Sequence, residues 1–514
     1  MRPNWAENLR VRRSRARQRI AGLAAGVAAA TVYAAAFGQS APIAPPGSSP
    51  EQPASADDAQ PPQLVSGISD QAPPALDLWS AIARRSNLLG TMGGLRTALG
   101  QYGMTLSLTE TSEVLGNLTG GIRQGFEYDG LTTATLQLDT QRAFNWYGGT
   151  FNVSALQIHG RNLSADNLDT LQTASGIEAD RATRLWELWY QQKFASGAAD
   201  VKLGQQSLDQ EFIVSQNALL FVNTMFGWPM VPSADLPGGG PAYPLSALGV
   251  RLRTQPTPGV TVLAGVFNGS PSPDNSIPDA QQADPSGTSF PLNGGALAIT
   301  ELQITSPAVG GMVPASETRP LSGTYKIGFW YDTEQFADLR YDNTGLPLAD
   351  PASTGMPLQH HGDYSIYGVI DQMVWQSTVD DSRILSVFGR AMGTPESDRN
   401  LVDFSLNAGL TLKDPLPDRP DDTFGAGLGF AHVSARRAGY DTDVAYFNPG
   451  VYSPAQGSET FIELTYQYQV TPWWQLQPDF QYVFNPSGGI PNPNNPTRKI
   501  GDEAVIGLRT NITF

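Results

Sequence analysis

The C-terminal segment of the chain alternates apolar and polar side chains up to its final residue. Ala504, Ile506, Leu508, Thr510, Ile512 and Phe514 share one parity, and Gly507, Arg509, Asn511 and Thr513 share the other. Successive side chains of a β-strand point to opposite faces, so one face of this segment suits lipid and the other suits water. Lipid cannot form hydrogen bonds with the unpaired N–H and C=O groups at an open sheet edge. Strands therefore cross a membrane only in closed barrels. The segment therefore predicts a transmembrane β-barrel.

The same two-residue period recurs from Met104 onwards. It predicts an all-β fold, an antiparallel transmembrane barrel of about 16 strands, preceded by a short helical segment. Short turns and long loops alternate between the strands, which is typical of barrels with periplasmic turns and external loops, although 307–322 and 394–400 break the alternation. The predicted strands are 104–114, 131–139, 150–158, 183–194, 200–206, 245–254, 259–268, 296–305, 323–332, 363–375, 383–392, 401–412, 423–434, 459–470, 472–484 and 504–514.

The N-terminal part divides into three pieces before the barrel domain at 104–514. Residues 1–38 combine seven Arg with an Ala-rich apolar run, which predicts a secretory signal peptide rather than a membrane anchor, because the run only just reaches spanning length. We prefer general secretion to the twin-arginine route that Arg12-Arg13 allows. Residues 39–75 are rich in Pro and Ala and predict a disordered linker. Residues 76–103 contain helix-like pieces.

Composition excludes several classes of protein. Seven of the 32 basic and one of the 48 acidic residues lie in the signal peptide, so the mature chain would carry a net charge of −22. Such a surface repels nucleic acid. The chain has no Cys, which excludes disulfide scaffolds and thiolate sites. After the signal peptide no run of 18 apolar residues occurs, which excludes a helical membrane protein.

We expect neither an enzyme nor a metal or other cofactor. The four His residues, at 159, 360, 361 and 432, do not lie beside a Ser-based motif. His360-His361 lies among Asp338, Asp342, Asp350 and Asp363, but no regular ligand spacing appears. We interpret this region as a solvated acidic loop.

A sixteen-stranded barrel encloses water, so selectivity requires an inward loop and charged wall residues. Residues 207–244 form the longest connection and are too apolar for a solvated loop. We expect this segment to pack inside the barrel, with a short helix between Phe212 and Val222 that ends by Gly227. The Gly-rich stretch that follows Asp235 requires unusual backbone angles.

Carboxylates, amides, Arg and aromatic rings near this loop are candidates for the pore constriction. Glu187 and Trp189 have lumen parity on the fourth strand, opposite to Trp186, and Arg251 would balance a carboxylate such as Glu187. The alternative role is electrostatic support. The candidates for the pore constriction are Glu187, Trp189, Asp209, Glu211, Asn217, Asn223, Trp228, Asp235, Arg251 and Arg253.

Several short motifs are shared with a known family. They are LGTMGGLR (89–96), TSEVLGN (111–117), QIHGR (157–161), LWELWY (185–190), GQQS (204–207), FGWP (226–229) and SALGVR (246–251). With these motifs the chain resembles the carbohydrate-selective porins of the OprB type. The similarity covers roughly Leu88–Phe514 and is densest from Met104 to Val266. The chain departs from the family in its Pro-rich linker and at Met92, where Trp is frequent.

The resemblance implies a sixteen-stranded barrel of the cell outer membrane that passes sugars by passive diffusion. The constriction candidates would then be its sugar contacts, because carboxylates, amides and Arg hydrogen-bond to hydroxyls and aromatic rings pack against sugar rings. Phe514 resembles the assembly signal of bacterial outer-membrane proteins, which implies contact with the barrel-assembly machinery. The expected partners are small neutral sugars and outer-membrane lipid, with a homo-oligomer left open. The alternative function is a structural or binding barrel whose lumen is plugged.

Overall fold

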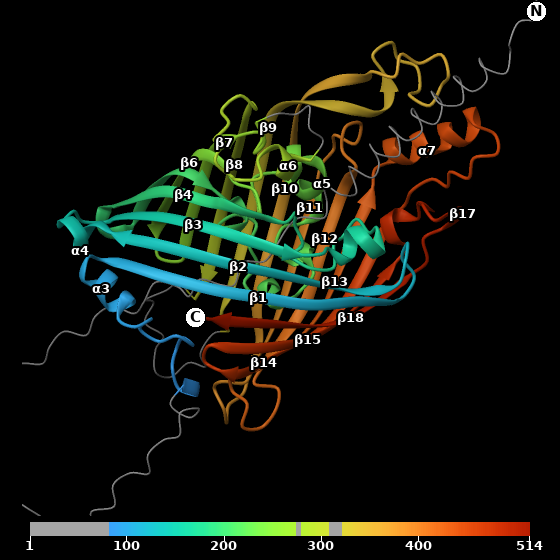
Figure 1. The fold of residues 1–514 in the computed structure, drawn as a ribbon. Coiled ribbons are helices and arrows are strands. Elements are labelled where there is room, and N and C mark those ends of the chain that lie inside the picture. Colours follow the sequence, from blue (N-terminus) through green and yellow to red (C-terminus); the bar gives the residue numbers. More distant parts are fainter. Residues whose placement is uncertain (1–81, 274–278, 308–320) are drawn as a thin grey trace, which may run out of the picture.

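The computed structural model describes residues 82–273, 279–307 and 321–514. Within these residues, sixteen antiparallel strands form a closed barrel, and β1 (Met104–Thr119) completes the circle against β18 (Glu503–Thr513) (Figure 1). The predicted all-β barrel is therefore confirmed. The predicted signal peptide and linker, and residues 76–81 of the predicted helical segment, lie outside the described residues.

The other fourteen barrel strands are β2 (Gly125–Asp139), β3 (Gly149–Gly160), β4 (Ala182–Phe194), β5 (Ala199–Gln206), β6 (Ala247–Thr257), β7 (Val260–Asn268), β8 (Ala296–Ser306), β9 (Gly323–Asp342), β10 (Pro357–Gln376), β11 (Ile384–Gly393), β12 (Val402–Lys413), β13 (Thr423–Val433), β14 (Glu459–Thr471) and β15 (Trp474–Phe484). The α-helices are α3 (Leu95–Gln101), α4 (Thr140–Phe144), α5 (Met230–Asp235), α6 (Ala280–Ala283) and α7 (Ala435–Phe447). Short 3₁₀ turns are η2 (Ala195–Gly197), η3 (Leu208–Gln210), η4 (Ala218–Leu220), η5 (Thr224–Phe226), η6 (Pro237–Gly239) and η7 (Pro486–Gly488), and η1 (Ser164–Leu168) is a π turn.

The alternation of side chains sets the two faces of the wall. In β14, Glu463 is buried inside the barrel, whereas its neighbours Ile462 and Leu464 are exposed on the outside. In β15, Gln481 faces inward in the same way. The lumen face is therefore polar, as the sequence predicts for these strands.

The two ends of the barrel differ. The end that carries α3 and α4 also receives the last residues of the chain, and we call it the turn end (Figure 1). The opposite end carries α7, and we call it the loop end (Figure 1). At the turn end, the backbone N–H of Phe514 donates to the Leu108 carbonyl at 2.9 Å, and Arg96 donates to the Phe514 carbonyl. Among the described residues, no helix is long and apolar enough to cross a membrane.

The loop end departs from the sequence prediction in two places. Residues 333–362 were expected to form a loop, but β9 continues to Asp342 and β10 begins at Pro357. This hairpin extends beyond the wall, where water on both sides removes the contrast between apolar and polar positions that reveals a strand. In addition, β16 (Pro491–Asn492) and β17 (Asn495–Lys499) form a small sheet outside the barrel.

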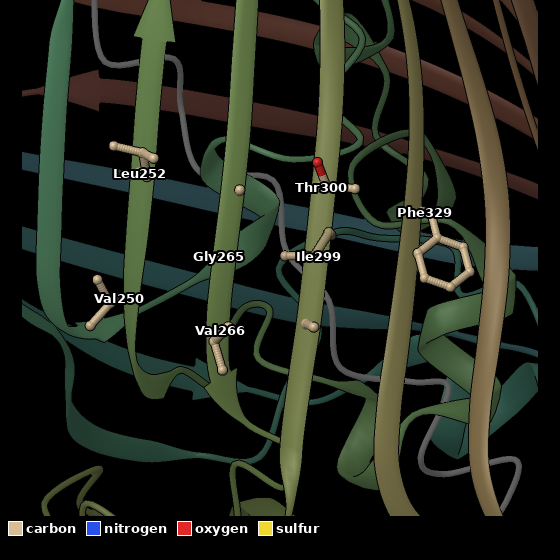
Figure 2. A pocket seen from close by; sticks show the side chains of 9 residues that line it. Val250, Leu252, Gly265, Val266, Ile299, Thr300 and Phe329 are labelled. Atoms are coloured by element: carbon tan, nitrogen blue, oxygen red, sulfur yellow. The ribbon is translucent and has the colours of Figure 1, made fainter.

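The outer face of β6 to β9 is apolar. Small residues on β7 and β8 leave an open groove of about 500 Å³ between larger side chains. Figure 2 shows the side chains that line it. The Thr300 hydroxyl donates to the Leu263 carbonyl at 3.1 Å, so it is satisfied within the wall. Such a surface suits the tails of lipids. The groove is lined by Val250, Leu252, Ala264, Gly265, Val266, Ala298, Ile299, Thr300 and Phe329.

Candidate functional site

The inward loop, residues 207–244, packs inside the barrel as predicted. Phe221 and Phe226 are fully buried, and their rings stack with centroids 4.3 Å apart. Phe226 also meets Phe388 of β11 and Phe461 of β14 edge on, with centroid distances of 5.7 and 5.5 Å. The apolar content of the loop is therefore explained by packing against the lumen wall.

The predicted helix between Phe212 and Val222 is wrong. The loop instead forms the turns η3, η4 and η5, and its α-helix, α5, comes later in the chain. Ile213 has a φ of 65°, which interrupts any helix there. The backbone N–H of Ile213 donates to Glu301 of β8 at 2.7 Å, and that of Val222 donates to Glu463 of β14 at 2.6 Å. Carboxylates of the wall thus replace the carbonyl acceptors that a helix would supply.

Two further wall carboxylates act in the same way. Asp371 of β10 accepts the Ser215 hydroxyl at 2.6 Å and the backbone N–H of Asn217 at 3.1 Å. Glu459 of β14 accepts the backbone N–H of Gln172, in the segment between β3 and β4, at 2.7 Å. The acidic groups of the wall therefore fix the backbone of segments inside the barrel, because buried N–H groups require acceptors.

Residues 161–181, between β3 and β4, form a second inward loop. The sequence placed this long loop outside the barrel, but Leu163 and Leu168 are fully buried. The two loops contact each other, because the N–H of Gly176 donates to the Val222 carbonyl at 2.8 Å and the Thr173 hydroxyl donates to that of Thr224 at 2.6 Å. The apolar residues at 163, 168, 171 and 177 were the available sequence signal. Both loops therefore narrow the lumen.

An ion-pair cluster lies where the inward loop meets β5 and β6. Arg251 pairs with Asp200 of β5 and, at 2.6 Å, with Glu211 of the loop, and Lys202 also pairs with Glu211. Arg253 lies 3.4 Å from Asp200. The side chain of Arg251 is only 3% exposed, whereas those of Glu211 and Arg253 are 22% and 35% exposed. Only the last two therefore remain accessible from the lumen.

Electrostatics holds Glu211 in its charged form. Burial by itself raises the pKa of Glu211, but the charges of Lys202 and Arg251 outweigh it and hold the pKa below its usual value. Asp200 and Lys202 were not among the predicted residues, although they alternate with Val201 and Leu203 in a period of two. That alternation was the signal that would have found them.

Glu187 and Trp189 of β4 face the lumen, but each already contacts another group of the protein. Glu187 accepts the backbone N–H of Ser207 at 3.1 Å, so it is not the partner of Arg251 that the sequence favoured. The ammonium of Lys202 lies 4.6 Å from the ring centroid of Trp189. Trp186 also faces inward, against the prediction, because a bulge in β4 opposite Ser154 and Ala155 shifts the register by one residue.

Three other predicted residues hold the inward loop in shape. Asn217 donates to Asp371 at 3.0 Å, and Asn223 donates to Gln481 at 3.0 Å. The indole N–H of Trp228 donates to the Gly239 carbonyl at 3.0 Å. Through these hydrogen bonds, Asn217 and Asn223 attach the loop to the barrel wall, and Trp228 joins two parts of the loop.

Asp235 is a buried carboxylate of the same loop, and Asp209 is a partly buried one. Asp209 accepts the Ser207 hydroxyl at 2.6 Å, and Asp235 accepts the backbone N–H of Leu401 at 2.8 Å. Burial raises the pKa of both, and in Asp235 the charge of Asp363 adds to the effect. Both therefore favour their neutral form more than a solvated Asp does.

Towards the turn end, the lumen wall carries neutral polar groups. These residues face inward on β1, β2, β14, β15 and β18 and are at least partly exposed. Hydroxyls and amides both donate and accept hydrogen bonds. The set comprises Thr105, Ser107, Thr109, Thr133, Thr135, Gln137, Gln467, Gln475 and Asn511.

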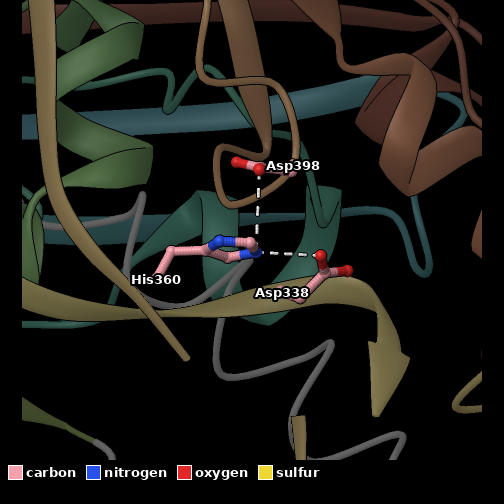
Figure 3. A group of neighbouring side chains, drawn as sticks. All are labelled: Asp338, His360 and Asp398. Carbon is pink, nitrogen blue, oxygen red and sulfur yellow. Dashed lines mark hydrogen bonds and ion pairs between the residues drawn. The ribbon is translucent and has the colours of Figure 1, made fainter. Parts of the chain in front are cut away.

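The acidic residues and His360 of the predicted acidic loop lie in different environments. His360 lies on β10 and contacts Asp338 of β9 at 2.9 Å and Asp398 at 3.6 Å, as Figure 3 shows. These three groups are close enough to share a metal ion. However, Arg436 of α7 lies 3.5 Å from Asp338, and Arg399 lies 2.8 Å from Asp398. These two positively charged guanidinium groups would repel a metal ion. We therefore interpret the cluster as a network of ion pairs.

The other acids of that region have separate structural roles. Asp342 accepts the backbone N–H groups of Thr344 and Thr354, at 2.9 and 2.8 Å, and so closes the end of the β9–β10 hairpin. Asp350 accepts the N–H of Ala352 at 2.8 Å within a turn. The expected solvated loop is thus an ordered hairpin.

Comparison with known proteins decides the family. The model of the OprB family of carbohydrate-selective porins matches residues 123–514. The chain belongs to this family. It is 27% identical over 430 residues to Porin B of Pseudomonas aeruginosa, a match that covers 79% of this chain and 88% of that protein. It is 24% identical over 470 residues to a putative porin, QuiX, of Acinetobacter baylyi, covering 87% and 97%.

A solved structure agrees with this result. The high-pH structure of Pseudomonas putida OprB superposes with a TM-score of 0.71 at 26% identity, covering 84% of this chain and 99% of that one. This OprB-family chain is therefore an outer-membrane porin for the passive diffusion of carbohydrates, and the turn end faces the periplasm. The family and the barrel point to a channel rather than an enzyme.

Proposed function

We propose that sugars cross this porin beside the ion-pair cluster, with Glu211 and Arg253 as the groups that contact them. The observation that carries this proposal is their exposure: they are partly accessible, whereas Arg251 and Lys202 are buried. A carboxylate accepts, and a guanidinium donates, hydrogen bonds to sugar hydroxyls. Arg251 and Lys202 are buried beside Glu211, and their ion pairs with Glu211 keep it charged and in place.

Small neutral sugars fit the rest of the route best. The wall towards the periplasm presents Thr and Ser hydroxyls and Gln and Asn amides, which exchange hydrogen bonds with hydroxyls without selecting for charge. Trp189 adds an aromatic side chain next to the cluster, although Lys202 lies over its ring. Asp209, Asn217, Asn223, Trp228 and Asp235 are proposed as anchors of the loop, and Glu187 as its support at Ser207.

Liposome swelling tests this proposal. Vesicles that contain the protein should swell faster in neutral monosaccharides than in amino acids of equal size. The Arg253→Gln and Glu211→Gln variants should lose this preference while still conducting ions. Arg383→Gln is a matched control, because Arg383 contacts Asp414 at the periplasmic turn, away from the cluster. A full sugar preference in both cluster variants would refute the assignment.

The alternative that the sequence left open, a barrel with a plugged lumen, does not agree with membership of the porin family. The two inward loops narrow the lumen and leave Glu211 and Arg253 partly accessible. Single-channel recording tests the proposed sugar route further, because sugar that binds at Glu211 and Arg253 should block the ion current. A block by sugar that is unchanged in both Arg253→Gln and Glu211→Gln would place the contacts elsewhere.

A further inference from the structure

The motif LGTMGGLR, at residues 89–96, lies just before β1 at the turn end of the barrel (Figure 1). Its backbone folds into consecutive tight turns, because the N–H groups of Gly90, Met92 and Gly94 each donate to the carbonyl three residues earlier. Gly93 and Gly94 have φ values of 64° and 95°, a region that glycine adopts without strain. The motif is therefore a compact bend that leads into α3.

This bend positions the guanidinium of Arg96, near the start of α3. Arg96 Nη1 donates to the Gly90 carbonyl at 2.7 Å, so the side chain is held by its own bend. Arg96 Nε donates to the Leu106 carbonyl of β1 at 3.2 Å, and Nη2 donates to the carbonyl of Phe514, directly after β18. One guanidinium therefore joins the bend to both strands of the seam, the pairing of β1 with β18 that closes the barrel.

Two further hydrogen bonds attach the residues before Arg96 to the same part of the wall. The backbone N–H of Leu88 donates to the carbonyl of Thr513, the last residue of β18, at 2.9 Å. The indole N–H of Trp473 donates to the Ile82 carbonyl at 3.0 Å, and Trp473 directly precedes β15. β15, β18 and β1 are consecutive strands of the barrel, so these contacts span the seam.

The seam leaves part of β1 without a partner strand. β1 pairs with β18 only from Thr109 onwards, whereas on its other side it pairs with β2 from Met104. Alternate carbonyls of a strand point to the same side, so those of Leu106 and Leu108 both point towards β18. Leu108 accepts the N–H of Phe514 at 2.9 Å, and Leu106 accepts Arg96 instead of a strand. Arg96 thus continues the pairing where β18 ends.

We propose that residues 82–103 form a latch that keeps the seam closed, with Arg96 as its positioning residue. Opening the seam would expose unpaired N–H and C=O groups along two strands, which lipid cannot satisfy. The latch docks fully only when β1 and β18 are paired, because its acceptors lie on both strands. It therefore stabilises the closed barrel against a barrel whose seam has opened.

Hydrogen–deuterium exchange of the full-length protein in detergent micelles, read by mass spectrometry, tests the proposal. Arg96→Gln should make the amides of β18 exchange about tenfold faster, because the seam opens more often, whereas β9 and β10, far from the seam in the strand order, should not change. Unchanged exchange in β18, or equally faster exchange in all strands, would overturn the latch.

Arg383→Gln is the matched control for this measurement. Arg383 Nε donates to the Asp414 carbonyl at 2.8 Å at another turn, so the variant removes the same kind of hydrogen bond away from the seam. Exchange in β18 should stay as slow in this variant as in the wild type. Equally faster exchange of β18 in Arg383→Gln would show that the effect is not specific to the latch.

A disulfide across the seam should compensate for the lost latch. The natural chain has no Cys, and Thr111 and Asn511 are register partners whose side chains form a hydrogen bond of 2.8 Å. In the Arg96→Gln background, oxidised Thr111→Cys/Asn511→Cys should restore slow exchange of β18, and the reduced form should not. Oxidised Ser386→Cys/Thr411→Cys, a register pair of β11 and β12, should not restore it. Restoration by both oxidised disulfides, or by neither, would place the defect outside the seam.

Trp473→Phe keeps the proposal testable if Arg96→Gln does not reach the membrane. This variant removes the indole N–H that binds the Ile82 carbonyl, so β18 should again exchange faster, by a smaller factor. Unchanged exchange of β18 in this variant would then overturn the latch. Sugar block should stay as in the wild type, because the latch lies at the turn end and not beside Glu211 and Arg253, so the result is independent of the proposed sugar route.

Discussion

Arg390 of β11 donates a hydrogen bond from Nη1 to the backbone carbonyl of Gly227 at 2.9 Å, inside the barrel. The same guanidinium donates to the carbonyls of Ile213, at 3.1 Å, and Met225, and to the side chain of Asn407. Arg390 is almost fully buried. One wall residue therefore fixes the inward loop at three points, and it does so through donors, whereas the wall carboxylates act through acceptors.

Replacing Arg390 should release the inward loop. In Arg390→Met, three loop carbonyls lose a charged donor, and hydrogen bonds to charged groups contribute about 1.5–3 kcal/mol each. We expect higher and noisier single-channel conductance and a weaker preference for sugars, with the barrel still closed. The measurement is planar-bilayer recording. Arg383→Met, at the turn before β11, is the control and should conduct as the wild type does; equal conductance in the two variants would contradict the anchoring role.

The two Arg residues of β6 should behave differently. Arg253→Gln removes an accessible donor and should weaken sugar block about tenfold, which corresponds to about 1.4 kcal/mol. Arg251→Gln leaves the buried Asp200 and the partly exposed Glu211 with less positive charge nearby, so it should lower the stability of the loop and change the ion selectivity first. Titration of the ion current with sugar, together with reversal potentials, distinguishes these effects. Sugar block lost only in Arg251→Gln would reverse the assignment.

Loop docking should depend on pH through Asp235. Burial, with the charge of Asp363 in addition, raises the pKa of Asp235 well above its usual value. The neutral form is therefore favoured when the loop is docked, so its contribution is full below the ordinary Asp range and is lost as pH rises through the raised pKa. Conductance should increase with pH over that window. Asp235→Asn should abolish the increase, since its amide oxygen still accepts the N–H of Leu401; an unchanged pH profile in that variant would exclude Asp235.

The barrel could be predicted because the alternation of apolar and polar side chains can be recognised within each strand separately. Phe480 and Ile506, which are partners in register on β15 and β18, both face lipid, and each follows the parity of its own segment. The alternation failed where the environment changed. Trp186 sits at a bulge, which no pattern of apolar residues reveals, and the β9–β10 hairpin extends beyond the lipid.

The contacts within the lumen were less predictable. Arg251 and Glu211 were both among the residues predicted for the pore constriction, but their pairing depends on how a long loop crosses the lumen. The backbone acceptors Glu301 and Asp371 appear in the sequence as ordinary lumen acids. Their role becomes visible only once the N–H groups of a distant loop lie opposite them.

The external ion-pair cluster should hold the β9–β10 hairpin without a metal ion. The carboxylate of Asp338 is nearly fully buried and faces both His360 and Arg436. Asp338→Asn removes its charge, so we expect the hairpin to separate from α7 more often and to be cleaved faster by protease, while conductance stays close to that of the wild type. Thermal unfolding of the purified wild type should be the same with calcium and with EDTA. A calcium-dependent rise in its melting temperature, absent from Asp338→Asn, would instead show that the cluster binds a cation.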